Sequence, residues 1–220
     1  MATAVYIEAS AKRAFASALE WPGWCRSGKG EEQALEALAA AAPRYAVVAE
    51  AAGFPLPAGA GEEFEVVERL PGTATTDFGA PDREASGDSR PLSDEEAERL
   101  AALLKGSWTA FDRVVAGAPA ELRKGPRGGG RDRDKIVAHV LGAEAGYASR
   151  LGLRLREPPW EDGAAVAAFR EAIAGALRTP PVEGPRGGKR WPGRYAARRI
   201  AWHALDHAWE MEDRTTPPGP

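Results

Sequence analysis

The chain has 220 residues, of which 44% are hydrophobic and 28% are charged, values typical of folded globular proteins rather than of disordered chains. Its net charge of −3 does not favour nucleic acid as a partner. No apolar run reaches the roughly 18 residues that a membrane span needs, and the length is sufficient for two small domains.

The first 70 residues are expected to form a small α+β domain. Val5 and Ile7 alternate with other residues, and the connection EASA before the next short run is short enough for a β-hairpin. A stretch rich in Ala and Leu begins at Glu31 and favours a helix. The predicted elements are strands around residues 5–7 and 12–19, a helix over 31–42 that residues 46–52 extend, and a strand over 64–68, in the order ββαβ.

Residues 71–91 are predicted to be a linker because they are rich in Gly, Pro, Asp, Ser and Thr. Phe78 is the only large apolar residue among them. The charge balance also changes at this point. Residues 1–70 hold 6 basic and 10 acidic side chains, a net −4, whereas the remainder of the chain holds 23 basic and 22 acidic ones, a net +1.

Residues 92–213 are expected to form an all-α four-helix bundle, followed by a flexible tail over 214–220. A capping box from Ser93 to Glu96 predicts the start of the first helix. Four stretches each carry one apolar stripe, and such helices bury their stripes best against each other. The stripes run through Leu100, Leu104, Trp108 and Phe111; Ile136, Val140, Ala143, Tyr147 and Leu151; Val166, Phe169, Ile173 and Leu177; and Trp202, Leu205 and Trp209, the last helix beginning at Pro192 and ending near Asp213.

The only three histidines, His139, His203 and His207, form a candidate metal site. His203 and His207 are four residues apart on the last helix, which places their Cβ atoms about 5–6 Å apart. His139 borders the inward face of the second helix and is the natural third ligand. Three imidazoles with an open fourth position are typical of catalytic rather than structural zinc. From the spacing alone, histidines that serve only as bundle residues are the more common case.

The segments IVAHVLGAE (136–144) and WHALDHAW (202–209) resemble the DinB-like family, which includes mycothiol-dependent maleylpyruvate isomerases and bacillithiol S-transferases. In that family, one histidine of the second helix and a pair spaced H-x-x-x-H on the fourth bind the metal. The resemblance covers about residues 92–213. It implies that His139, His203 and His207 hold a divalent metal such as Zn, Ni or Fe. It also implies an enzyme that uses a low-molecular-weight thiol, such as mycothiol or bacillithiol, on a small-molecule substrate, with metal-assisted hydrolysis as the alternative chemistry.

The segment WPGWC (21–25), followed by Gly28, Glu32, Ala34 and Leu35, resembles the HicB-like antitoxin domain over about residues 4–70. No ribbon-helix-helix or helix-turn-helix pattern follows it, and the acidic charge of residues 1–70 opposes binding to phosphates. DNA binding is therefore not expected. The resemblance leaves a second hypothesis open, in which the chain is a non-catalytic binding or regulatory protein. The HicB-like domain would then dock a partner or form a homodimer, and the metal would stabilise the bundle.

Four charged residues lie near the histidines in the sequence, and three of them have two candidate roles. Arg199, four residues before His203, could hold a substrate carboxylate through its planar guanidinium. We expect instead that it forms an ordinary ion pair within the bundle. Asp206 could orient an imidazole or remain solvated. Glu210 is expected to face the same cleft, and Glu144 to be paired or solvated.

The last helix begins with basic residues and ends with acidic ones, the reverse of the order that the helix dipole favours. Either ion pairs across helices stabilise this order, which we expect, or the basic residues form a rim that attracts an anionic thiol or acid. The single cysteine, Cys25, is expected to be a buried structural thiol, because all three histidines are distant from it in sequence. One cysteine and the lack of a secretory pattern predict a cytoplasmic protein.

Overall fold

Four strands from the first 71 residues form one sheet in the order β3-β2-β1-β4. The structure is a computed structural model and describes residues 2–125, 129–180 and 188–215. Strand β1 (Thr3–Ala9) pairs antiparallel with β2 (Ala14–Ala18) and parallel with β4 (Phe64–Pro71). Strand β3 (Cys25–Gly28) lies at the edge and pairs antiparallel with β2. The prediction of an α+β arrangement for this part is confirmed.

The observed order is βββααβ, so the predicted ββαβ order lacked one strand and one helix. Strand β3 has the sequence CRSG, which carries no apolar alternation, and it exists because its backbone pairs with β2. The predicted helical region divides at Ala41 into α1 (Glu31–Ala40) and α2 (Ala42–Ala51). Pro43 lies in the first turn of α2, where its missing N–H is tolerated, whereas it would break a continuous helix.

The segment predicted as a linker contains a short helix, α3 (Ala74–Phe78), and a 3₁₀ turn, η1 (Ser86–Ser89). It is attached to the sheet by Glu8, a fully buried residue of β1. The Glu8 carboxylate accepts hydrogen bonds from the Thr76 hydroxyl and from the backbone N–H groups of Asp82 (2.8 Å) and Arg83 (2.9 Å). These bonds satisfy a buried charge and hold the segment in place.

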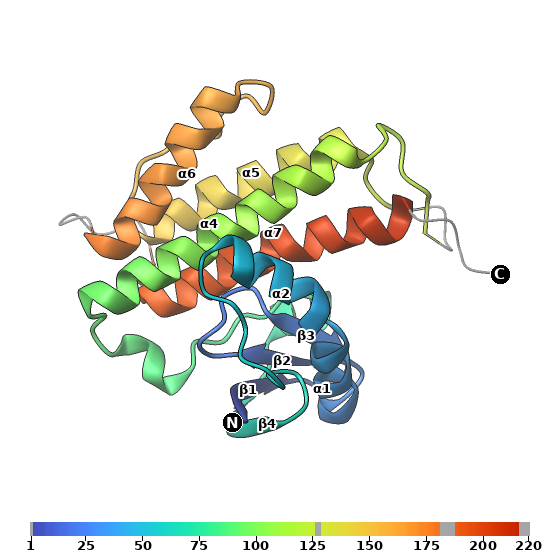
Figure 1. The fold of residues 1–220 in the computed structure, drawn as a ribbon, viewed down its shortest axis with the longest axis vertical. Helices are drawn as coiled ribbons and strands as arrows, with labels where there is room; N and C mark the ends of the chain where they lie inside the picture. The colour runs from blue at the N-terminus through green and yellow to red at the C-terminus, as the bar shows by residue number, and fades with distance from the viewer. Residues whose placement is uncertain (1, 126–128, 181–187, 216–220) are drawn as a thin grey trace.

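The four predicted long helices are present as α4 (Asp94–Gly117), α5 (Arg133–Arg150), α6 (Gly163–Arg178) and α7 (Gly193–Thr215). Helix α4 contacts α6, α7 and α2, and α5 contacts α7. Figure 1 shows α6 on the side of α4 that is remote from the sheet. The predicted capping box is confirmed, because the Glu96 N–H donates to Ser93 Oγ (3.1 Å) and the Ser93 N–H donates to Glu96 Oε2 (2.8 Å).

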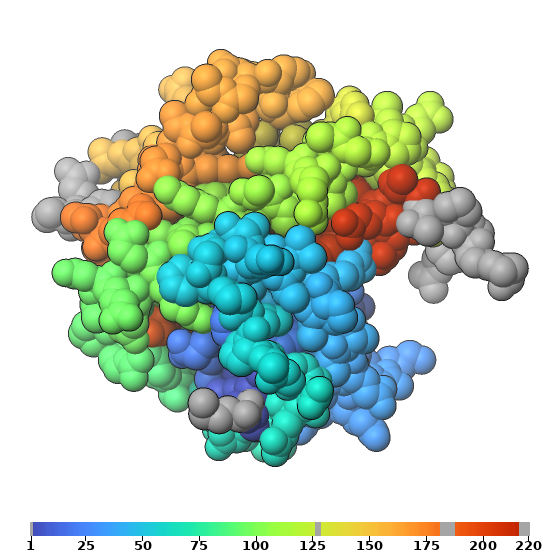
Figure 2. All heavy atoms as spheres, in the orientation of Figure 1, coloured from blue at the N-terminus to red at the C-terminus, as the bar shows by residue number. Residues whose placement is uncertain are grey.

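The sheet-containing part and the helices share one hydrophobic core. Figure 2 shows the blue-to-cyan surface of the first part directly against the green surface of α4. The turn at Gly23 packs tightly against α7, since a Cβ at this residue would lie 2.7 Å from Leu205 Cδ1. Gly23 also has a φ of 92°, a region that glycine adopts most readily. The predicted core residues Trp202, Leu205 and Trp209 are all buried.

Some predictions fall on residues that are not described. Of the predicted tail 214–220, Arg214 and Thr215 belong to α7, and residues 216–220 lie outside the described part. Residues 126–128 and 181–187, which connect predicted helices, also lie outside it. Among the described residues, no helix combines the length and apolar character needed to cross a membrane.

Candidate metal centre

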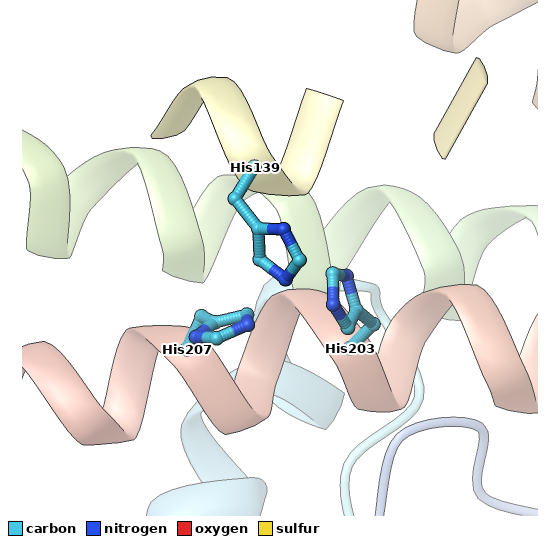
Figure 3. A group of neighbouring side chains, drawn as sticks. All are labelled: His139, His203 and His207. Carbon is cyan, nitrogen blue, oxygen red and sulfur yellow. The ribbon is translucent and has the colours of Figure 1, made fainter. Parts of the chain in front are cut away.

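The three histidines come together although they are up to 68 positions apart in the chain. His139 extends from α5 toward α7, where His203 and His207 lie one turn apart (Figure 3). One ligand atom from each ring lies within 4.8 Å of the others. The ring centroids of His139 are 5.0 Å from those of both His203 and His207, and the latter two are 4.8 Å apart. The predicted triad is thus assembled in space.

These separations are close to those of a metal site. Tetrahedral coordination at about 2.0–2.1 Å per nitrogen places ligand nitrogens roughly 3.4 Å apart. The largest contraction that the triad would need is therefore about 1.4 Å. His139 and His207 are only partly buried, and rotation of the His139 side chain is the movement that would close most of this gap.

The surroundings favour neutral imidazoles, the form that binds metals. Burial, reinforced by the neighbouring His207 and Arg199, lowers the pKa of His203 to about 2. The pKa of His139 is also lowered, mainly by burial and then by His207. Both rings consequently keep a lone pair available at neutral pH.

His207 is oriented by a carboxylate that belongs to its own helix. Its Nδ1 lies 2.8 Å from Glu210 Oε2, and Arg214 Nη1 donates to Glu210 Oε1 at 2.7 Å. The hydrogen bond with His207 lowers the pKa of Glu210, so this carboxylate is ionised and accepts a hydrogen bond from the Nδ1–H group of the ring. The Nε2 atom of His207 then carries the lone pair, as in the carboxylate–histidine–metal arrangement.

His203 has a different environment from His207. It is 8% exposed, and its Nδ1 is buried with no hydrogen-bond partner in the described part of the chain. The rings of Tyr147 and Trp202 pack around it, with centroid distances of 5.7 and 6.1 Å. A buried ring nitrogen without a partner is unfavourable unless a ligand or an ion satisfies it. This observation and the all-imidazole donor set fit a divalent transition metal.

Asp206 and Glu144 have specific partners in the structure. Asp206 forms an ion pair with Arg26 of β3 at 3.2 Å, and its side chain is 41% exposed, which fits the predicted solvated charge rather than a partner of an imidazole. Glu144 is buried and forms an ion pair with Arg170, so the paired alternative is confirmed and the solvated one is wrong. Its carboxylate accepts hydrogen bonds from Trp108 Nε1 (2.8 Å) and Arg170 Nε (3.2 Å).

The expected ion pairs of α7 are also present. Because their partners come from other elements, they stabilise a charge order that the helix dipole opposes. Arg194 pairs with Glu96, Arg198 with Asp88 and Lys189 with Glu84 near the start of the helix, and Arg44 of α2 pairs with Glu212 and Asp213 near its end.

Arg199 is the exception, because the expected ion pair is not found for it among the described residues. It is 9% exposed, and its Nη1 is buried without a hydrogen-bond partner. Its guanidinium carbon lies 4.7 Å from the ring centroid of Trp202 and 5.3 Å from that of Tyr147. The cation is therefore flanked by aromatic rings, next to His203.

Cys25 is buried, as expected, and accepts a hydrogen bond from Ser17 Oγ at 2.9 Å. Burial raises the pKa of this thiol to about 12. A protonated and inaccessible thiol is a poor nucleophile, so Cys25 has a structural role.

Sequence reasoning did not identify Arg214 or Tyr147 as neighbours of the site. Arg214 follows Glu210 by four positions and His207 by seven, a helical spacing that could have indicated the chain His207–Glu210–Arg214. Tyr147 was assigned to an apolar stripe of its helix. Its contact with His203 depends on how α5 crosses α7, which no spacing reveals.

Comparison of the chain with protein-family models, with curated proteins and with solved structures gave no match. The chemistry of the site is therefore argued from its residues and their geometry.

Proposed function

We propose that this protein is a divalent-metal-dependent enzyme of the DinB-like type that uses a low-molecular-weight thiol. His139, His203 and His207 would hold the metal, with Zn, Ni or Fe as the candidates that suit imidazole ligands. The observation that carries the proposal is the convergence of three imidazoles from two helices, with ligand atoms within 4.8 Å of one another. The DinB-like resemblance of residues 92–213 supports the same three ligands.

A divalent ion held by three neutral ligands keeps its full charge and would stabilise an anionic ligand such as a thiolate. Glu210 keeps His207 in the tautomer that offers Nε2. Tyr147 and Trp202 limit the access of water to His203.

The thiol in this proposal comes from a small molecule. Cys25 is the only cysteine of the chain, and it is buried, hydrogen-bonded and protonated. A cytoplasmic location, which we propose from the sequence, would supply reduced thiols such as mycothiol or bacillithiol.

The first test is the metal content of untagged protein, measured by elemental mass spectrometry. About one equivalent per chain is expected, and His139→Ala and His203→Ala should both lose it. Asp206→Asn is the matched control, because this residue lies between the two histidines of α7 but pairs with Arg26. Protein that cannot be loaded with Zn or Ni would refute the metal site.

The second test separates an enzyme from a binding protein. Metal-loaded protein is incubated with mycothiol or bacillithiol and an electrophilic acceptor, and the loss of free thiol is followed. Turnover that His207→Ala abolishes is the expected result. Bound metal without any turnover, together with a stoichiometric protein partner in a pull-down, would instead favour the regulatory role.

A further inference from the structure

The arginines of α7 differ in one respect that points to a ligand. Arg194 and Arg198 are buried and each pairs with a carboxylate outside the helix. Arg199 is equally buried, yet no described residue accepts a hydrogen bond from it or forms an ion pair with it. A buried guanidinium without an acceptor destabilises the fold. Such exceptions to local rules are expected at binding sites.

The surroundings of Arg199 define where an anion could reach it. On the side of the sheet it borders a cavity of about 10 Å³, lined also by Tyr6, Cys25 and Arg198. This volume holds about one water molecule and is too small for a carboxylate. Tyr147 of α5 flanks Arg199 and also contacts the ring of His203. An anion bound to Arg199 beside Tyr147 would therefore lie next to the histidine triad.

Aromatic side chains lie on the side of Arg199 where Tyr147 is found. Tyr147, which flanks Arg199, packs against Trp191 with ring centroids 5.3 Å apart, and both residues are partly exposed. Trp191 in turn contacts Tyr195 at 5.0 Å. A planar guanidinium next to aromatic faces suits a carboxylate attached to an apolar or aromatic body, because the fork binds both oxygens and the rings contact the remainder.

We infer that Arg199 binds the anionic group of the substrate, and that the substrate of the metal site is a small carboxylate with an apolar or aromatic body. The claim that the bound carboxylate is a substrate rests on the proposed function, whereas the binding of an anion to Arg199 requires no metal. A carboxylate between Arg199 and the triad would also reduce the repulsion between the guanidinium and a divalent ion.

The test is isothermal titration calorimetry, in which the affinity of metal-free protein for acetate, succinate and benzoate is measured at constant ionic strength. Wild-type protein should bind at least one of them, with benzoate the tightest. Arg199→Met should weaken this binding by about tenfold or more, as expected for loss of hydrogen bonds to a charged group. The affinity of Arg199→Lys should lie between those of the wild type and Arg199→Met, because lysine keeps the positive charge but lacks the planar pair of N–H donors. Arg194→Met, the matched control, should bind like the wild type.

Urea unfolding of the same variants separates a binding role from a structural one. Arg194→Met should lower the urea midpoint because it breaks the pair with Glu96. Arg199→Met should leave the midpoint unchanged or raise it, since it removes a buried and unpaired charge. The inference is overturned if none of the three acids binds to the wild type, if Arg199→Met binds them equally well, or if it destabilises the fold as much as Arg194→Met.

Metal content, measured in parallel, keeps this inference distinct from the proposed function. Arg199→Met should retain the metal, because Arg199 is not a ligand. If wild-type protein binds benzoate through Arg199 but takes up no metal, the proposed function fails and the anion site stands. If wild-type protein takes up metal and none of the acids binds, the anion site fails and the proposed metal site stands.

Discussion

Replacement of Glu210 by glutamine tests whether the carboxylate beside His207 prepares this ring for a metal. The carboxylate lies 2.8 Å from Nδ1 and fixes the tautomer that presents Nε2. An amide in its place lacks the charge, and its NH₂ group can face the ring instead of its oxygen. Loss of such a partner typically weakens metal binding by about 10–100-fold, or about 1.4–2.7 kcal/mol. The Glu210 side chain is 34% exposed, so solvent screens the interaction and we expect the lower limit, roughly tenfold.

The assay is competition for Zn against a chromophoric chelator at pH 7.5, with Glu212→Gln as the control. Glu212 lies on the same helix, but its carboxylate binds Arg44 of α2. The control should keep wild-type affinity for Zn. Equal affinities of Glu210→Gln and the wild type would show that Glu210 does not orient His207, and the argument from the tautomer would be wrong.

Three further predictions concern stability. Gly23→Ala should lower the free energy of unfolding in urea by about 1–3 kcal/mol, since Gly23 has a positive φ and an added Cβ would lie 2.7 Å from α7. Gly53→Ala is the control and should lower it less, because Gly53 has a positive φ but open space around it. Glu144→Ala should cost about 3–5 kcal/mol because it leaves the buried Arg170 partly uncompensated, and a loss below about 1 kcal/mol would contradict this. His203 has a folded-state pKa of about 2, below its ordinary value, so the unfolded chain binds the extra proton. Metal-free protein should therefore lose up to about 1.4 kcal/mol per pH unit from this group as the pH falls below about 6.5, a slope that His203→Gln should reduce.

Features of the chain that depend on neighbours a few residues apart were predictable from the sequence. The capping box at Ser93 and Glu96 and the four amphipathic helices follow from spacings within one or two turns, and all are present. The pair His203 and His207 belongs to the same class, because residues four apart on a helix always share a face. The assignment of His139 as the third member also proved consistent with the structure, since its position beside an apolar stripe turns it toward another helix.

Contacts between distant residues were decided only by the tertiary structure. Asp206 pairs with Arg26, which is 180 positions away, and Glu8 holds a segment more than 65 positions further along the chain. Strand β3 forms through backbone bonds to β2, although its side chains carry no strand pattern. The isolation of Arg199 is of the same kind, since whether an arginine has a partner depends on every element packed against it. Periodicity reports which face of an element is buried, but only the packing of elements determines what that face meets.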